Sequence, residues 1–356
     1  MVSWLRSQRI GKASASVAEP IGAILVATIL CGIVLLATGH DPVFAYGQLI
    51  QRTLLRPLGL QETIVRAGPI LIAGVAVLVA VKAGLWNIGI DGQVLMGALA
   101  AGYVGAHLAS VPGPLLWACC AGVGAFAGGL WALVPALLRA RWGLNEIVTS
   151  IMFNYVAFSL GAWLVKGPIR DRSLVTPQTV MIPRDVRLTS IGDTRLHLGI
   201  IAAVALALVL YLVLRHTVAG FELTFVGANV RAARHGLIPV TSYLIGAFIT
   251  SGAIAALAGV NDVLSTKGTF QAEWNPGYGL AAFALVFLAR RNPLGLIPAA
   301  LFLGFLAYGA DIMPRAADIA PAFFDLFEGM LLMVLALSTW IHVRVARNAT
   351  LVGDAS

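Results

Sequence analysis

The feature that most constrains this chain is a succession of continuous apolar runs separated by short polar segments. A helix that crosses a bilayer needs about 20 mainly apolar residues. The first run, 21–37, is long for a signal peptide and lacks a clear cleavage site, so we interpret it as a retained first span. We expect about ten spans, at roughly 21–38, 64–82, 87–109, 114–138, 145–165, 197–214, 241–263, 277–290, 294–312 and 322–342.

The composition excludes a soluble globular protein. Of the 356 residues, 59% are hydrophobic and 11% are charged, whereas a soluble domain carries about 25% charged residues. A membrane β-barrel would need alternating apolar and polar residues, but the runs here are continuous. The sequence therefore predicts an all-α polytopic membrane protein in contact with lipid.

The distribution of basic residues predicts the orientation in the membrane. The net charge is +8, and most basic residues lie in the segments between spans. Placing the N-terminus in the cytoplasm puts most of these residues on the inner side, as the positive-inside rule requires. With an even number of spans the C-terminus is also cytoplasmic. Because this rule accounts for the charge, and no basic patch is interleaved with exposed aromatic residues, we expect no nucleic acid partner.

One transmembrane domain is expected to occupy residues 21–342, between cytoplasmic tails at 1–20 and 343–356. An outer loop at 166–196 mixes charged residues with three prolines and is unusually long. It is either a lid or docking surface, or a plain connection. Small residues are frequent at 118–129 and 246–259, which favours close helix packing.

Polar residues near the starts of two predicted spans are candidates for a translocation path or gate. They are Asn87, Asp91 and Gln93 near the third span, and Asn145, Glu146 and Asn154 near the fifth. An ionisable group in the membrane usually faces a partner or a water-filled cavity. Acidic residues also favour helix N-termini through the helix dipole, so both acids have a capping interpretation that stays open.

A polar segment at 215–240 lies between two apolar runs on the predicted inner side. Gly227, Ala228 and Asn229 interrupt the chain, and 230–236 predicts a short helix with Arg231 and Arg234 on one face. Gly236 ends this helix. The segment is either a surface on which a second protein acts, or a loop that only joins two spans.

Motifs for catalysis or cofactor binding are missing from the sequence. It contains no Walker A phosphate loop and no HExxH, CxxC or GxSxG pattern. We therefore expect neither an enzyme nor a cofactor or metal site in this chain.

Five motifs, in order along the chain, resemble those of ABC-importer permeases for simple sugars and nucleosides, within the broader group that includes branched-chain amino acid permeases. They are Asn87-Ile-Gly-Ile-Asp-Gly-Gln93, Asn145-Glu-Ile-Val-Thr with Asn154-Tyr155, Gly227-Ala-Asn-Val-Arg-Ala-Ala-Arg-His-Gly236, Ser251-Gly-Ala-Ile-Ala-Ala-Leu-Ala-Gly259, and Asn292-Pro-Leu-Gly295. Asp91 stands where the family pattern has Glu, and His235 where it has Tyr. The matches cover most of the chain, from about 84 to 297.

The resemblance implies a type II ABC importer-like permease in the bacterial inner membrane. Its partners would be two cytoplasmic ABC ATPase subunits, a second permease subunit, and a periplasmic or lipid-anchored solute-binding protein. The 227–236 segment would then be the coupling helix, with contacts to the ATPase from Gly227, Asn229, Arg231, Ala232, Ala233 and Arg234. A nucleoside or purine-like solute is the first cargo hypothesis, a simple sugar the second and a branched-chain amino acid the third.

Two other classes of function were weighed against an ABC permease. An ion-coupled secondary transporter would use Asp91 or Glu146 as the coupling group and would need no ATPase. A membrane enzyme or scaffold is disfavoured because no cluster of His, Ser, Cys or carboxylate residues converges in the sequence.

Overall fold

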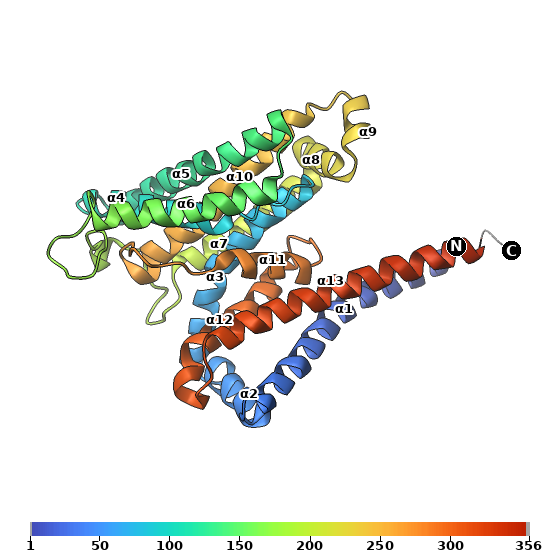
Figure 1. The fold of residues 1–356 in the computed structure, drawn as a ribbon, viewed down its shortest axis with the longest axis horizontal. Coiled ribbons are helices and arrows are strands. Elements are labelled where there is room, and N and C mark those ends of the chain that lie inside the picture. Colours follow the sequence, from blue (N-terminus) through green and yellow to red (C-terminus); the bar gives the residue numbers. More distant parts are fainter. Residues whose placement is uncertain (1, 354–356) are drawn as a thin grey trace.

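The structure is a computed structural model that describes the backbone of residues 2–353 and the side chains of 19–338, 340 and 341. Helices make up most of it (Figure 1). The α-helices are α1 (Val2–Ala37), α2 (Pro42–Ile50), α3 (Pro57–Lys82), α4 (Ile90–His107), α5 (Gly113–Trp142), α6 (Glu146–Lys166), α7 (Leu198–His216), α8 (Val218–Ala228), α9 (Val230–His235), α10 (Val240–Asp262), α11 (Tyr278–Leu288), α12 (Leu296–Ala317) and α13 (Ala322–Gly353). Short π-helical turns at Gln51–Leu55 and Val263–Lys267 and a 3-10 turn at Arg184–Val186 complete the elements of the described chain.

Seven stretches in the described part of the chain are long and apolar enough to span a membrane, fewer than the ten expected. They lie at Glu19–Ala37, Pro57–Lys82, Gly113–Trp142, Glu146–Lys166, Leu198–His216, Val240–Lys267 and Leu296–Ala317. Two of the remaining predicted spans are shorter in the structure. α4 begins at Ile90 rather than at 87, and α11 has 11 residues, which at 1.5 Å per residue is about half the hydrocarbon thickness.

α10 is the central helix, and it packs against α5, α4 and α3. Its contact with α5 depends on small residues, as expected from the sequence. A Cβ atom built on Gly128 of α5 would lie 2.4 Å from the carbonyl oxygen of Gly252 on α10. The two backbones approach so closely that a side chain at this crossing would force the helices apart.

The long loop between α6 and α7 packs onto the segment that follows α10. Thr179 N donates to Phe270 O at 3.0 Å, Ile182 N to Gly268 O at 2.9 Å, and Leu188 N to Leu264 O at 3.0 Å. The predicted outer loop is therefore held to the bundle by backbone hydrogen bonds rather than extending away from it.

α1 and α13 contact each other, and both extend from the rest of the bundle toward the same side in Figure 1. α1 is continuous from Val2, so residues 2–20, predicted as a tail, continue the helix of the first span. Glu19 pairs with Arg290 at 3.2 Å and accepts a hydrogen bond from Ser338 at 2.7 Å. This contact joins α1 and α13 to the turn between α11 and α12.

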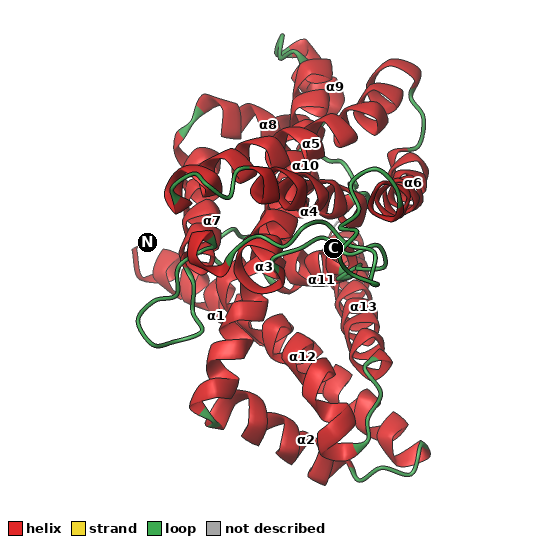
Figure 2. Cartoon of the chain, turned by 90° about the vertical axis from the view of Figure 1, so that its left-hand side faces the viewer, coloured by secondary structure: helices red, strands yellow, loops and turns green. Residues whose placement is uncertain are grey.

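The 215–240 segment contains two helices where one was predicted. α8 occupies Val218–Ala228, so Gly227 and Ala228 do not interrupt the chain but form the last turn of a helix. The break falls at Asn229, and α9 follows at Val230–His235. α9 lies at the edge of the molecule opposite α2 (Figures 1 and 2).

Candidate functional site

The segment between α3 and α4 is held by a buried pair of side-chain amides. Asn87 and Gln93 are 0% and 1% exposed and donate to each other's amide oxygens at 2.9 and 3.0 Å. Asn87 also donates to Ser251 Oγ of α10 at 2.9 Å, and Ser251 donates to the carbonyl of Ala76 on α3 at 2.7 Å. The network satisfies buried polar groups and joins α3 and α10 to the start of α4.

Asn154 of α6 holds the same segment from the other side. Its Oδ1 accepts from Gly92 N at 2.8 Å, and its Nδ2 donates to Ile88 O at 2.8 Å. The asparagine therefore substitutes for backbone hydrogen bonds where the chain is not helical.

Asp91 connects the starts of two helices. It lies in the first turn of α4, is partly buried, and accepts a hydrogen bond from Gly279 N of α11 at 2.7 Å. A Cβ atom on Gly279 would lie 2.5 Å from Asp91 Oδ2. A carboxylate at a helix N-terminus is favoured by the exposed N–H groups and the helix dipole, and here that helix is α11.

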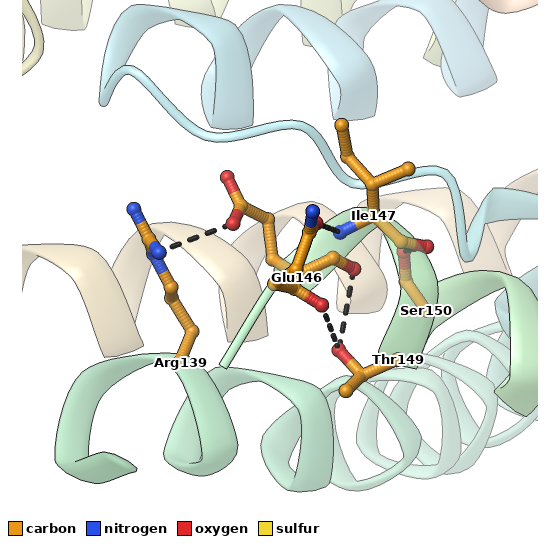
Figure 3. A network of polar contacts seen from close by, with 6 residues as sticks. Arg139, Glu146, Ile147, Thr149 and Ser150 are labelled. Carbon is orange, nitrogen blue, oxygen red and sulfur yellow. Dashed lines mark hydrogen bonds and ion pairs between the residues drawn. The ribbon is translucent and has the colours of Figure 1, made fainter. Parts of the chain in front are cut away.

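Asn145 and Glu146 form the start of α6. Asn145 is its N-cap, and Oδ1 accepts from Ile147 N at 2.9 Å. Glu146 is 7% exposed, and its Oε2 lies 3.3 Å from Nε of Arg139 on α5 (Figure 3). Asn145 therefore caps the helix, and Glu146 lies in its first turn.

The six predicted path residues thus fall into two groups. Asn87, Asp91, Gln93 and Asn154 meet around the segment that opens α4, whereas Asn145 and Glu146 lie at the turn between α5 and α6. Among the described residues no group of three or more His, Cys, Asp or Glu side chains could hold a metal ion.

α9 is attached to the bundle by one face and open on the other. Asn229 is its N-cap, and Oδ1 accepts from Ala232 N at 3.0 Å. Ala233 is fully buried and packs in a small apolar cluster with Val226 and Val240. Ala232 is partly buried, whereas the side chains of Arg231 and Arg234 are exposed, as the sequence predicted. The helix therefore presents two positive charges to the outside.

α8 connects α9 to the turn that precedes the amide network. A Cβ atom on Gly227 would lie 2.1 Å from Lys82 O and 2.8 Å from Gly84 N. Gly84 has a φ of +76°, and a Cβ atom built on it would lie 3.1 Å from Gly227. The last turn of α8 thus rests directly on the backbone that leads to Asn87.

Sequence reasoning missed two features of this surface. Leu237 follows α9, has a φ of 59° and is 91% exposed. The other is the contact of Gly227 with the Lys82–Gly84 turn. The sequence contains no signal for the first, because Leu237 is followed by Ile238 and Val240, which are also apolar. The second depends on residues that are far apart in sequence.

A bundle of membrane-length apolar helices with a short basic helix exposed at its edge defines an all-helical, multi-pass membrane protein. The chain belongs to the family described as branched-chain amino acid transport system / permease component, whose model matches residues 59–336.

Three relatives match nearly the whole chain. The glucose ABC transporter permease protein TsgB13 of Haloferax volcanii is 35% identical over 90% of this chain and 87% of its own length. The guanosine ABC transporter permease protein NupP of Bacillus subtilis is 30% identical, with 90% and 92% covered. The nucleoside ABC transporter permease protein NupB of Lactococcus lactis is 26% identical, with 92% and 93% covered.

The chain is therefore a permease component of an ABC transporter and a multi-pass protein of the cell membrane. A permease component acts together with ATPase and substrate-binding partners and is not itself an enzyme.

Proposed function

We propose that this permease imports a nucleoside or purine-like solute, or else a simple sugar, and that a separate ATPase drives it through α9. The observation that carries the proposal is the continuous contact from α9 through Gly227 of α8 to the Lys82–Gly84 turn. A displacement of α9 would be passed by backbone contact to the segment that opens α4. Because packed backbones do not deform continuously, such a displacement favours a switch between two arrangements.

The exposed face of α9 is suited to a protein partner. Arg231 and Arg234 offer charge for pairing with acidic side chains, and Leu237 offers an apolar contact at the tip. Ala233 fixes the helix to the bundle on its other face. We infer contact with the ATPase through the accessible residues Asn229, Arg231, Ala232 and Arg234. Ala233, which is fully buried, and Gly227, which rests on the Lys82–Gly84 turn, instead hold the segment to the bundle.

The complete transporter would contain two ATPase subunits, this permease with an identical or similar second permease, and a periplasmic or lipid-anchored binding protein. Both termini would be cytoplasmic, in a bacterial inner membrane. The arrangement of the helices supports this orientation, because α9 and the ends of α1 and α13 lie toward the same side of the molecule in Figure 1. The loop between α6 and α7 lies at the other end (Figure 1).

The choice of cargo follows from the relatives. NupP and NupB are named for guanosine and nucleosides and TsgB13 for glucose, whereas the family description names branched-chain amino acids. The solutes in the names of these three relatives are neutral and rich in hydroxyl groups. We therefore place a nucleoside first, a sugar second and a branched-chain amino acid last.

Ion coupling through Asp91 or Glu146 is the weaker alternative. Asp91 is occupied as the cap of α11, and Glu146 is paired with Arg139. Each carboxylate has a role in holding helices together that does not require exchange with an ion.

Uptake in proteoliposomes tests the proposed function. The permease is reconstituted with its ATPase and binding protein, and labelled guanosine, glucose and leucine are offered with ATP or ADP. We expect ATP-dependent accumulation of guanosine or glucose. Accumulation driven by a proton or sodium gradient without the ATPase would support the secondary transporter instead.

A further inference from the structure

A cavity of about 420 Å³ opens beside the loop between α6 and α7, on the opposite side of the bundle from α9. The lining residues come from that loop and from the segment before α11, and are Thr176, Pro177, Gln271, Ala272, Glu273, Trp274 and Asn275. The volume lies within the range of about 300–1,000 Å³ found for small-molecule sites. We propose that this cavity is an entry site for a neutral, hydroxyl-rich solute with a flat face, and the proposal rests on the import function above.

The aromatic wall of the cavity has a fixed orientation. Trp274 meets Phe270 edge to face, with ring centroids 6.1 Å apart and planes at 90°. Phe270 is 2% exposed and lies between α4 and α6, because Cβ atoms on Gly102 and Gly161 would each lie 3.2 Å from it. A preorganised indole face stacks on a purine base or on the apolar face of a sugar ring without ordering a loose side chain.

The polar wall consists mainly of neutral hydrogen-bonding groups. Asn275 Oδ1 accepts from Gly277 N at 3.2 Å, which leaves its NH₂ group to donate to a solute oxygen. Gln271 Nε2 donates to Gln178 Oε1 at 3.3 Å, so the orientation of this amide is also fixed. Thr176 adds a hydroxyl group. Side-chain amides and hydroxyls are suited to the hydroxyl groups of a ribose or hexose.

The charge of the lining disfavours an amino acid. The only ionisable side chain that lines the cavity in the described chain is Glu273, and its carboxylate lies 3.9 Å from Nζ of Lys166. No basic side chain lines the cavity to bind a carboxylate. The site therefore separates hydroxyl-rich neutral solutes from branched-chain amino acids.

The cavity is joined to the starts of α4 and α11. Three residues after Asn275, the Tyr278 hydroxyl donates to Asp262 Oδ2 of α10, and Gly279 N donates to Asp91. A solute that stacks on Trp274 therefore contacts the short segment that enters α11. The cavity is thus connected through α11 and Asp91 to the start of α4, and α9 is connected to the turn before α4 through Gly227.

Saturation-transfer difference NMR on the purified permease in lipid nanodiscs tests the site without the partner proteins. The probes are guanosine, glucose and leucine at millimolar concentration. We expect transfer to guanosine or glucose and none to leucine. Trp274→Ala and Asn275→Ala should each abolish most of the signal, whereas Trp274→Phe should keep it. Trp163→Ala is the matched control, because Trp163 of α6 is 64% exposed and outside the cavity.

The two proposals fail in different ways. If neither guanosine nor glucose gives a signal, or if Trp274→Ala and Asn275→Ala bind like the wild type, the entry site is wrong. Transport of guanosine by the reconstituted complex would still support the function in that case. Saturation transfer to leucine that Trp274→Ala removes would overturn the selectivity. Absence of any ATP-dependent uptake by the complex would overturn the proposed function itself.

Discussion

At the scale of the residue, the polar groups that stood out in the apolar sequence are the ones that the structure buries and pairs. Asn87 and Gln93 were predicted as membrane-embedded polar residues, and they form one amide pair. The third side chain of this network, Ser251, lies 164 residues from Asn87. The polarity of a residue can be read from the sequence, but the partner that satisfies it depends on how the helices pack.

Replacing Asn87 with alanine should lower the thermal stability of the permease. The change leaves Gln93 and Ser251 buried with fewer partners, at a cost of about 1–3 kcal/mol for each group left unsatisfied. Asn145→Ala is the control, since loss of an N-cap costs about 1 kcal/mol. Thermal unfolding in detergent measures both variants. A smaller loss for Asn87→Ala than for Asn145→Ala would contradict the role of the network.

His197 should make stability depend on pH. It precedes the α7 span, is 4% exposed, and no described residue forms a hydrogen bond to its ring nitrogens. Burial lowers the pKa of His197 to about 4, so below an ordinary pKa of about 6.5 the unfolded chain binds a proton that the folded chain does not. Stability should therefore fall as pH decreases from about 6.5 towards 4, by up to about 1.4 kcal/mol per pH unit.

His197→Gln isolates this contribution. The difference in unfolding temperature between wild type and variant, measured across that pH window, should shrink or reverse as the solution becomes more acidic. Parallel curves for the two proteins would show that His197 does not titrate differently on folding.

At the scale of the element, the sequence predicted α9 but not α8. Residues 218–228 read as part of a polar loop because Thr217, Gly220 and Glu222 interrupt the apolar pattern. In the structure Thr217 caps α8 by accepting from Gly220 N at 3.1 Å, so a helix begins inside the segment that the sequence predicted as polar. Gly227 was part of the sequence motif. Only the structure shows why a glycine is needed there, because its backbone contacts Lys82 and Gly84.

Gly227→Ala should impair coupling more than assembly. The new methyl group would meet Lys82 O and force α8 away from the turn before α4. We expect ATP hydrolysis by the complex to continue while uptake per ATP falls several-fold. Gly246→Ala is the matched control, because a Cβ atom at that helical glycine meets nothing within 4 Å. Equal uptake per ATP hydrolysed in the two variants would show that Gly227 does not contribute to coupling.

Leu237→Asp should weaken association with the ATPase. An exposed leucine held at positive φ is suited to an apolar pocket on a partner, and a carboxylate there would have to be desolvated. Copurification of the ATPase with the permease should fall about tenfold, as a loss near 1.4 kcal/mol implies. Val175→Asp, at a residue 93% exposed in the loop between α6 and α7, should leave copurification unchanged. A larger loss of copurification with Val175→Asp than with Leu237→Asp would place the ATPase on the side of the loop between α6 and α7.

At the scale of the whole molecule, the fold class follows from hydropathy, but the number and lengths of the helices do not. Apolar runs predicted the seven stretches of membrane length because each is continuous. α11 is short because its first turn follows Gly277, which has a φ of 67° and comes after a segment that is not helical. α4 has 18 residues, but Asp91 and Gln93 interrupt the apolar character of its start. Hydropathy also cannot show that Asp91 and Gly279, 188 residues apart, lie in contact.

The central claim is that the permease is driven from outside the membrane through the exposed face of α9. The most direct measurement is uptake per ATP hydrolysed in proteoliposomes that contain the complete transporter with Arg231→Glu and Arg234→Glu. The control is the double variant Arg141→Glu, Arg215→Glu. It changes two exposed arginines of α5 and α7 and alters the net charge by the same amount. We expect hydrolysis to continue in both variants, and uptake per ATP to fall about tenfold in the Arg231→Glu, Arg234→Glu variant alone. Unchanged uptake per ATP in that variant would contradict the central claim.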